Sequence, residues 1–317
     1  MKFPVFDLHC DTALELLGRK DKQQISIAKN SLHIDLERAK SLSGYAQCFA
    51  CFTTPDMTKW MGVSPEAVFK AEQAAIMNAI QKHSDVFCQA FNADDIEKNR
   101  RNGTISAILT IEGPSGFGFD SAKLEELYEI GFRITTLGWN ESNVLTGSHV
   151  TGEGLTEKGR EYIRQAQRLG MIIDVSHISD TAFWQIMDMT AAPVIASHSN
   201  SRRICNVSRN LTDEMFVALC KTGGLTGINL YTEFLGENPD IGTVCDHILH
   251  FLELDPAGEH IALGGDLDGC DTLPTGFSGV QDYNKLSDAL LSRGVPEHII
   301  LNIFWNNAMG VMKKCCM

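Results

Sequence analysis

Residues 3–12 read FPVFDLHCDT, and this stretch decides between the two α/β architectures that the chain could adopt. The segment Phe3–His9 is an apolar run typical of a buried β-strand. An open, doubly wound sheet would place a glycine-rich phosphate-binding loop directly after such a first strand. Here His-Cys-Asp-Thr follows, and no Gly-Lys pair occurs in the chain, which excludes a P-loop. The stretch therefore favours a closed barrel over the open sheet.

Seven further strand candidates alternate with helical patterns along the 317 residues. Eight β/α units in a chain of this length predict the α/β class and a (β/α)8 TIM barrel. No internal repeat, low-complexity tract or linker interrupts the pattern, so we expect a single domain over residues 1–317. The expected strands are Phe3–His9, Tyr45–Thr53, Thr104–Ile111, Phe132–Leu137, Met171–Val175, Pro193–His198, Gly224–Leu230 and His260–Gly265.

Metal-ligating side chains follow five of these strands. Residues i and i+2 of an extended chain point to the same face, so His9 and Asp11 can reach one metal ion while Cys10 points away. The C-terminal ends of the strands form the active face of a barrel. Strands one and eight become neighbours only if the sheet closes, which brings the first pair close to the eighth-strand acid. The candidates at the other four strand ends are Glu112, His177, His198 and the pair Asp266 and Asp268.

The expected ligand set consists of His9, Asp11, Glu112, His177 and His198. These nitrogen and oxygen donors without a thiolate suit Zn²⁺, with Mn²⁺, Fe²⁺ or Co²⁺ as alternatives. Five ligands exceed the three that one catalytic zinc ion takes, whereas two ions that share a carboxylate account for the number. Two such ions can bridge a water molecule and lower its pKa towards about 7. The sequence thus predicts a barrel of the metal-dependent hydrolase type.

The same strand ends resemble the membrane (renal) dipeptidase family, a zinc metallopeptidase branch of the amidohydrolase-like barrels. The resemblance runs over nearly the whole chain, from Asp7 to Asn307, and fits a soluble bacterial branch. The segments that carry it are Asp7-Leu8-His9-Cys10-Asp11, Ile111-Glu112-Gly113, Gly131-Phe132-Arg133, Ile173-Asp174-Val175-Ser176-His177, Ser197-His198-Ser199, Arg209-Asn210-Leu211 and Gly264-Gly265-Asp266-Leu267-Asp268-Gly269.

The resemblance implies which of these residues hold the metal. It implies two zinc ions per chain, the first on His9 and Asp11, the second on His177 and His198, with Glu112 as the bridge.

Two further residues take roles by resemblance. Asp266 would move the proton during the reaction, and Arg209 would hold the substrate carboxylate, whereas Asp268 is expected to be structural. A guanidinium suits this role because it can bind a carboxylate through two hydrogen bonds. The expected function is hydrolysis of small dipeptides, including those with a C-terminal D-residue, and the resemblance also implies a homodimer.

Trp139 departs from the family pattern. Better-known members carry a histidine at this position after strand four, which helps to polarise the scissile carbonyl. An indole donates one hydrogen bond but cannot act as a general acid. Trp139 is therefore expected to contact the substrate, or else carbonyl polarisation is left to the metal. The substitution keeps open a related amidohydrolase that acts on a lactone, a β-lactam or an N-acyl amino acid. A metal-binding barrel without catalysis is a third alternative, and His149 is a minor candidate for substrate contact.

Composition excludes several other classes of protein. Lys and Arg number 27 against 40 Asp and Glu, a net charge of −13, which opposes binding to nucleic acid or anionic lipid. The N-terminus lacks the features of a signal peptide and no apolar run is long enough to span a membrane, so we expect a cytoplasmic protein. The ten cysteines are then expected to be reduced, and Cys48 and Cys51 to be core thiols rather than a redox or zinc pair.

Overall fold

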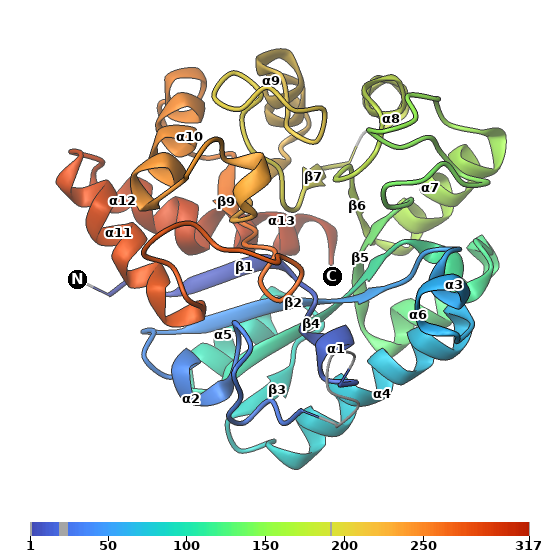
Figure 1. The fold of residues 1–317 in the computed structure, drawn as a ribbon, viewed down its shortest axis with the longest axis horizontal. Helices are drawn as coiled ribbons and strands as arrows, with labels where there is room; N and C mark the ends of the chain where they lie inside the picture. Colours follow the sequence, from blue (N-terminus) through green and yellow to red (C-terminus); the bar gives the residue numbers. More distant parts are fainter. Residues whose placement is uncertain (1, 19–24, 191, 317) are drawn as a thin grey trace.

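A closed ring of eight parallel strands forms the centre of the molecule (Figure 1). The computed structural model describes residues 2–18, 25–190 and 192–316. Strand β2 pairs with β1 on one side and with β4 on the other, and this second pairing closes the ring. The ring strands are β1 (Val5–Cys10), β2 (Tyr45–Phe52), β4 (Ile105–Glu112), β5 (Phe132–Thr136), β6 (Ile172–Asp174), β7 (Val194–Ala196), β8 (Leu225–Ile228) and β9 (Ile261–Leu263). The predicted (β/α)8 barrel is confirmed. Each of the eight expected segments contains a ring strand, and only β1 and β4 extend beyond their expected segments, by one residue each.

One additional strand was not predicted from the sequence. Strand β3 (Phe87–Gln89) pairs only with the first residues of β4 and lies outside the ring. It uses the part of the β4 edge that precedes the pairing of β4 with β5 at Leu109. Three residues are too few to show the alternation by which strands are recognised in a sequence.

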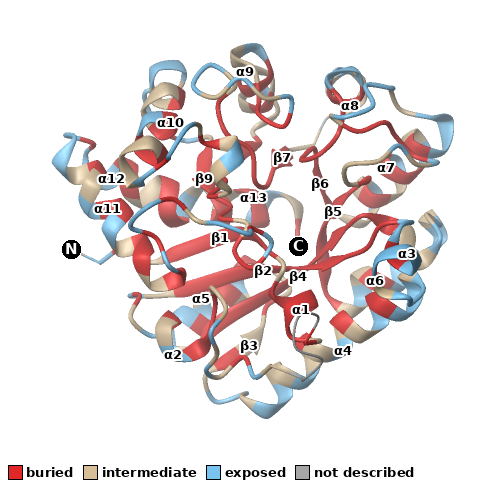
Figure 2. Cartoon of the chain, in the orientation of Figure 1, coloured by how far each residue is buried: buried red, intermediate tan, exposed pale blue. Residues whose placement is uncertain are grey.

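Helices cover the outside of the ring and bury its outer face (Figure 2). Thr156 and Thr212 cap α7 and α9 by accepting backbone N–H groups, and Gly170 and Gly223 end these two helices in the left-handed conformation. The α-helices are α1 (Thr12–Glu15), α2 (Leu36–Ala39), α3 (Met57–Met61), α4 (Pro65–Lys82), α5 (Ala93–Arg101), α6 (Leu124–Ile130), α7 (Glu157–Leu169), α8 (Asp180–Met189), α9 (Asp213–Thr222), α10 (Ile241–Leu254), α11 (Tyr283–Ser292), α12 (Glu297–Leu301) and α13 (Asn307–Cys315). Short 3₁₀ turns, η1 (Pro114–Phe117), η2 (Ser121–Lys123), η3 (Thr232–Phe234) and η4 (Val280–Asp282), and a π-helical turn, η5 (Asn302–Asn306), complete the chain.

The interior of the ring is apolar at the end where the strands begin. Every ring strand contributes an aliphatic, aromatic or thiol side chain to one buried cluster, for example Phe6, Ile108 and Ile195. Trp305 and the inner face of α13 belong to the same cluster, so the C-terminal helix seals this end. Cys48 lies in this cluster and Cys51 in the separate cluster between ring and helices, so the two thiols do not form a pair.

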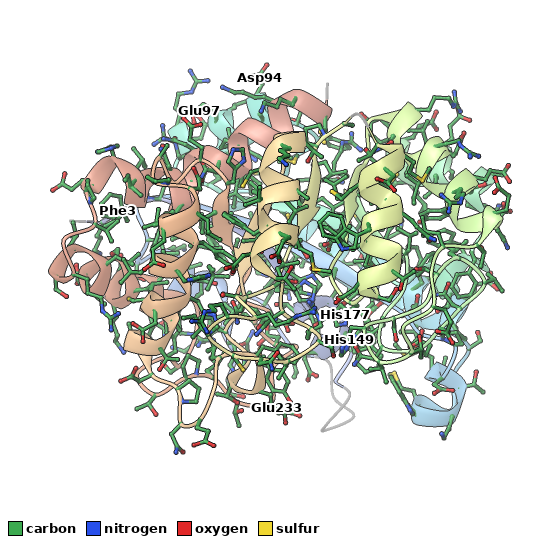
Figure 3. The ribbon with its side chains drawn as sticks, turned by 90° about the horizontal axis from the view of Figure 1, so that it is seen from above. Phe3, Asp94, Glu97, His149, His177 and Glu233 are labelled. Carbon is green, nitrogen blue, oxygen red and sulfur yellow. The ribbon has the colours of Figure 1, made fainter. Side chains whose placement is uncertain are left out.

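The two ends of the ring are distinguished in Figure 3, where Asp94 and Glu97 of α5 lie at one end and His149 and His177 at the opposite end. The histidines mark the end where the strands finish, and the longest loops gather there. No helix in the described part of the chain is long and apolar enough to cross a membrane.

Candidate metal centre

Two of the predicted ligands lie at the end of strand β1, where the pairing of β1 with β2 is irregular. Between Asp7 and Cys10 the register with β2 shifts, so that β1 carries one residue more than its partner. Such a bulge re-aims side chains and is common beside active sites. His9 and Asp11 face each other with 3.7 Å between Nε2 and Oδ2, while Cys10 is buried in the outer core. The predicted orientation of these three side chains agrees with the structure.

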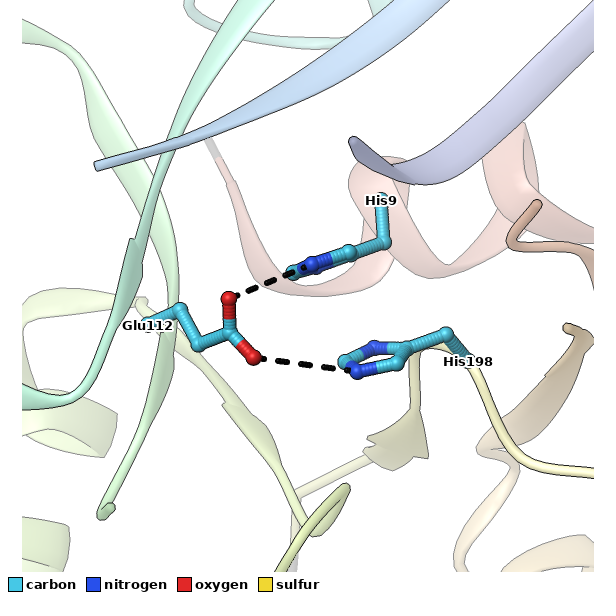
Figure 4. Close-up of side chains that lie close together, drawn as sticks. All are labelled: His9, Glu112 and His198. Carbon is cyan, nitrogen blue, oxygen red and sulfur yellow. Dashed lines mark ion pairs between the residues drawn. The ribbon is translucent and has the colours of Figure 1, made fainter. Parts of the chain in front are cut away.

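Glu112, at the end of β4, lies between the histidines from opposite parts of the ring. Its Oε2 is 3.3 Å from Nε2 of His9, and its Oε1 is 3.0 Å from Nε2 of His177 and 3.8 Å from Nε2 of His198. Figure 4 shows two of these pairs, with one carboxylate oxygen directed to His9 and the other to His198. The side chain is 3 % exposed, so this carboxylate is removed from bulk water.

His177 and His198 point their Nε2 atoms at each other over 2.9 Å. Nδ1 of His177 donates to Oδ1 of Asn140, and Nδ1 of His198 donates to Oγ of Ser197, whose hydroxyl in turn donates to Asp174. With both Nδ1 atoms protonated, each Nε2 presents a lone pair. Two facing lone pairs repel unless a cation lies between them, which is the arrangement found for metal-bound histidines.

Asp266 and Arg209 lie beside this cluster. Oδ1 of Asp266 is 3.8 Å from Nε2 of His9, and its Oδ2 accepts a hydrogen bond from Asn229. The Asp266 backbone has a φ of 55°, a left-handed conformation that is rare outside glycine and frequent at functional sites. Arg209 donates to Oγ of Ser199 and to the carbonyl oxygen of His198, and its Nε is buried without a hydrogen-bond partner.

Burial dominates the electrostatics of the cluster. It raises the pKa of Glu112 to about 8 and that of Asp266 to about 6, and it lowers the pKa of His177 and His198 well below the ordinary range. Burial also lowers the pKa of His9, but the carboxylates of Glu112 and Asp11 outweigh it and hold that pKa above its usual value. Concentrated acidic groups in a dry site are unfavourable, and a bound cation would offset this cost.

The residues fit a metal centre by three independent observations. Nε2 of His9 and Oδ1 of Asp11 are buried without a hydrogen-bond partner. The ligand atoms of His9, Glu112 and His198 lie within 4.8 Å of one another, as do those of His9, Asp11 and Asp266. A Cβ on Gly269 would overlap carboxylate oxygens of Asp11 and Asp266, so only glycine lets the backbone close on these groups.

A cavity of about 170 Å³ opens onto the centre. Glu112, His177, Asp266 and Trp139 line the cavity. This position of Trp139 is compatible with the predicted contact with substrate. Arg209 and His149 are not among the lining residues. The ring of His149 instead forms hydrogen bonds within the loops, from Nε2 to Oδ1 of Asn140 and between Nδ1 and Oγ of Ser208.

Several residues of the site were not found by sequence reasoning. Asn140 orients His177, and Asp174 with Ser197 orients His198. Asp174 and Ser197 belong to segments that carry the family resemblance, but no role was predicted for them. Hydrogen-bonding partners of this kind carry no spacing signal, because their distance in sequence depends on loop paths. Of the aromatic residues that line the cavity, Trp139 was predicted, whereas Phe52 and Trp60 come from other segments and were missed for the same reason.

The chain matches a known protein family over its whole length. The model of the membrane dipeptidase family (peptidase family M19) matches residues 1–316. This chain belongs to the membrane dipeptidase family. The barrel, the ligand-bearing strand ends and the match over the whole chain agree with one another, and the expected resemblance is confirmed.

Relatives of this family resemble the chain over most of its length. A dipeptidase of Schizosaccharomyces pombe described as uncharacterised is 28 % identical over 98 % of this chain and 80 % of its own length. A dipeptidase of Claviceps purpurea is 29 % identical over 75 % of this chain and 58 % of its own. A metallo peptidase from Rhodobacter sphaeroides, solved with a phosphinate mimic of the dipeptide L-Ala-D-Ala, superposes with a TM-score of 0.89 at 25 % identity, covering 99 % of this chain and 100 % of that chain.

The membrane dipeptidase family and these relatives fix the class of the enzyme. The chain is a metal-dependent dipeptidase, a hydrolase that acts on peptide bonds. The third alternative, a barrel that binds metal without catalysis, is therefore set aside.

Proposed function

We propose that this dipeptidase holds two metal ions, normally Zn²⁺, with Glu112 as the shared ligand. The observation that carries the proposal is the orientation of the Glu112 carboxylate, whose Oε2 faces His9 and whose Oε1 faces His177 and His198. His9 and Asp11 would hold the first ion, and His177 and His198 the second. The donor set of imidazoles and carboxylates suits zinc, with Mn²⁺, Fe²⁺ or Co²⁺ as substitutes.

Two ions held in this way would activate a water molecule as the nucleophile and withdraw electrons from the substrate carbonyl. The position of Asp266 suits proton transfer. It lines the cavity, its Oδ1 lies 3.8 Å from Nε2 of His9, and its Oδ2 accepts the hydrogen bond from Asn229. It would accept a proton from the attacking water and deliver it to the leaving amine as the C–N bond breaks.

Arg209 is proposed to bind the C-terminal carboxylate of the dipeptide. Its guanidinium is buried near the acidic cluster, and burial lowers its pKa to about 10, so it stays charged at neutral pH. Both terminal nitrogens already donate to Ser199 and to the His198 carbonyl, whereas Nε has no partner. Since the guanidinium does not line the cavity, the proposed role requires it to turn towards the substrate when a carboxylate arrives.

The volume of the cavity supports a small substrate. About 170 Å³ suits a ligand of roughly dipeptide size. The relative from Rhodobacter sphaeroides binds a mimic of L-Ala-D-Ala, which supports extending the proposal to dipeptides with a C-terminal D-residue. A homodimer in the cytoplasm remains our prediction for the assembly and location of the enzyme.

The test is a metal analysis combined with a substrate screen. Purified protein reconstituted with zinc should contain about two ions per chain and should hydrolyse L-L and L-D dipeptides. The same screen should include N-acyl amino acids, a lactone and a β-lactam, because Trp139 lines the cavity and bears on the substrate class. No bound metal after reconstitution would refute the metal assignment, and activity confined to the non-peptide substrates would establish the alternative amidohydrolase.

A further inference from the structure

Three aromatic side chains form one wall of the cavity above the metal centre. We call Phe52, Trp60 and Trp139 the aromatic wall. The ring of Trp139 meets Phe52 edge-on with 5.2 Å between centroids and Trp60 edge-on with 5.4 Å, so it lies between the other two. Phe52 ends strand β2, Trp60 lies on α3 and Trp139 follows β5. All three line the cavity.

The aromatic wall is anchored below and open above. Phe52 is buried in a small core with Leu14, Met57 and Val68, and Trp139 packs against that core. Trp60, in contrast, is 49 % exposed at the outer edge of the wall. A large indole that is half exposed beside a catalytic cavity has apolar area available for a ligand.

The opposite wall of the cavity has a different character. Tyr231 and Phe234, which follow β8, pack edge-on against each other, and the guanidinium of Arg209 lies 5.6 Å from the ring centre of Phe234. In the ring order β1-β2-β4-β5-β6-β7-β8-β9, β8 lies across the barrel from the β2-to-β5 arc that carries the aromatic wall. The carboxylate-binding side and the aromatic wall therefore face each other across the metal centre.

The charged residues that line the cavity favour the same orientation of a dipeptide. Glu15 of α1 and Asp268, which are not predicted metal ligands, also line the cavity, and Leu14, the neighbour of Glu15, belongs to the core under the aromatic wall. No lysine or arginine is among the described residues that line this cavity. An ammonium group is favoured on the α1 side, whereas a carboxylate is favoured near Arg209.

We propose that the aromatic wall binds the side chain of the N-terminal residue of the dipeptide and makes the enzyme selective for apolar and aromatic residues at that position. The inference rests on the proposed dipeptidase function and on the orientation that places the C-terminal carboxylate near Arg209. The free amino group then lies on the α1 side, and the adjacent side chain packs on Trp139 and Trp60. Trp60 and Trp139 are thus specificity-determining residues.

The experiment measures kcat/KM of the zinc-loaded enzyme on two matched series, Gly-Ala, Leu-Ala and Phe-Ala, and Ala-Gly, Ala-Leu and Ala-Phe. Wild type should prefer Phe-Ala to Gly-Ala by about tenfold or more, because an apolar side chain in a complementary pocket contributes on this order. In the second series the preference should be smaller. Trp60→Ala should reduce the Phe-Ala to Gly-Ala ratio about three- to tenfold, the range typical of losing one aromatic contact. A ratio cancels any loss that is common to both substrates.

Trp184→Ala is the matched control. Trp184 on α8 is also a half-exposed tryptophan, 41 % exposed, and packs edge-on against Phe183, but it does not line the cavity. This variant should keep the wild-type ratio. An unchanged ratio in Trp60→Ala, or a preference that follows the C-terminal residue instead, overturns the inference while leaving the dipeptidase function intact. Absence of hydrolysis on every dipeptide would instead overturn the proposed function itself.

Discussion

The two ends of the barrel interior are built from the same eight strands, but one end holds apolar side chains and the other holds polar ones. Where the strands begin, side chains such as Phe6, Ile108 and Ile195 pack with Trp305 and α13 into a sealed apolar cluster. Where the strands finish, the inward positions hold imidazoles and carboxylates around an open cavity. Close apolar packing of this kind is the main source of stability in a folded domain, whereas crowded buried acids are unfavourable.

Stability and chemistry are therefore separated along the strand axis. The Glu112 carboxyl illustrates the unfavourable side, because burial raises its pKa to about 8. A variant at the cavity end should therefore alter metal binding and catalysis, while a variant at the sealed end should alter the free energy of unfolding.

The largest effect is expected from Glu112→Gln. The amide keeps the shape of the side chain but removes the charge that both ions would share, so at least one ion should be lost. Activity should fall by more than the ~10²–10⁴-fold typical of losing an acid–base group. Elemental analysis and kcat/KM on a dipeptide measure the two effects. A variant that retained both ions and most of its activity would contradict the bridging role.

Asp266→Asn should lower kcat by ~10²–10⁴-fold without loss of metal. Asparagine keeps the size of the side chain and its contact with Asn229, but it cannot carry the proton. Elemental analysis supplies the control, because a fall in metal content would assign Asp266 a ligand role instead. Wild-type turnover in this variant would transfer the proton-carrying role to Asp268 or to another group.

At the sealed end, Ile108→Ala should lower the free energy of unfolding by about 2–5 kcal/mol, because it leaves a cavity in the cluster of buried side chains. Metal content and kcat/KM of the folded fraction should stay at wild-type values. Denaturant unfolding and elemental analysis measure the pair. A loss of metal in this variant would show that the two ends of the barrel are coupled rather than separate.

Arg209→Met should discriminate between a dipeptide and its C-terminal amide. A charge-assisted hydrogen bond contributes about 1.5–3 kcal/mol, so the variant should lose roughly 10- to 100-fold in kcat/KM on the free dipeptide, mainly through KM. The amide, which has no carboxylate, should be little affected. Arg209→Lys should rescue only part of the loss, because an ammonium cannot reproduce the guanidinium fork. Equal losses on both substrates would mean that Arg209 only supports the site through Ser199 and His198.

The smallest effect is expected from His149→Gln in the loops over the cavity. Burial, together with the positive charges of Arg209 and Arg202, lowers the pKa of His149 to about 4. Between about pH 6.5 and pH 4 the unfolded chain binds a proton at this residue and the folded chain does not, so stability falls as the pH falls. The variant lacks this contribution, and its melting temperature should approach or exceed that of wild type on acidification. A constant difference in melting temperature from pH 7 to pH 4 would contradict the assignment.

The sequence was sufficient for features that depend on local pattern. The eight ring strands alternate with helices along the chain, and ligand-type residues follow the strands directly, as in the segment from Ile111 to Gly113. The bulge in β1 was not predictable, because register is a property of two strands and not of one. Neither was the orientation of Arg209, which depends on where Ser199 and the His198 carbonyl lie. The aromatic wall depends on residues of strand β2, helix α3 and the segment after β5, which meet only in the folded chain.

Closure of the ring has a consequence for the order in which the chain can fold. Thr12 donates a hydrogen bond to Asp268 over 2.6 Å although 256 positions separate them in the sequence, and β1 pairs with β9. Contacts between such distant segments form late and slowly, since loop-closure entropy must be overcome first. His9 and Asp11 leave the ribosome early but meet Asp266 only after the last strand is made. The rate at which refolding protein takes up metal would therefore report the rate of ring closure. Stopped-flow measurement with a metal-sensitive dye would measure this rate.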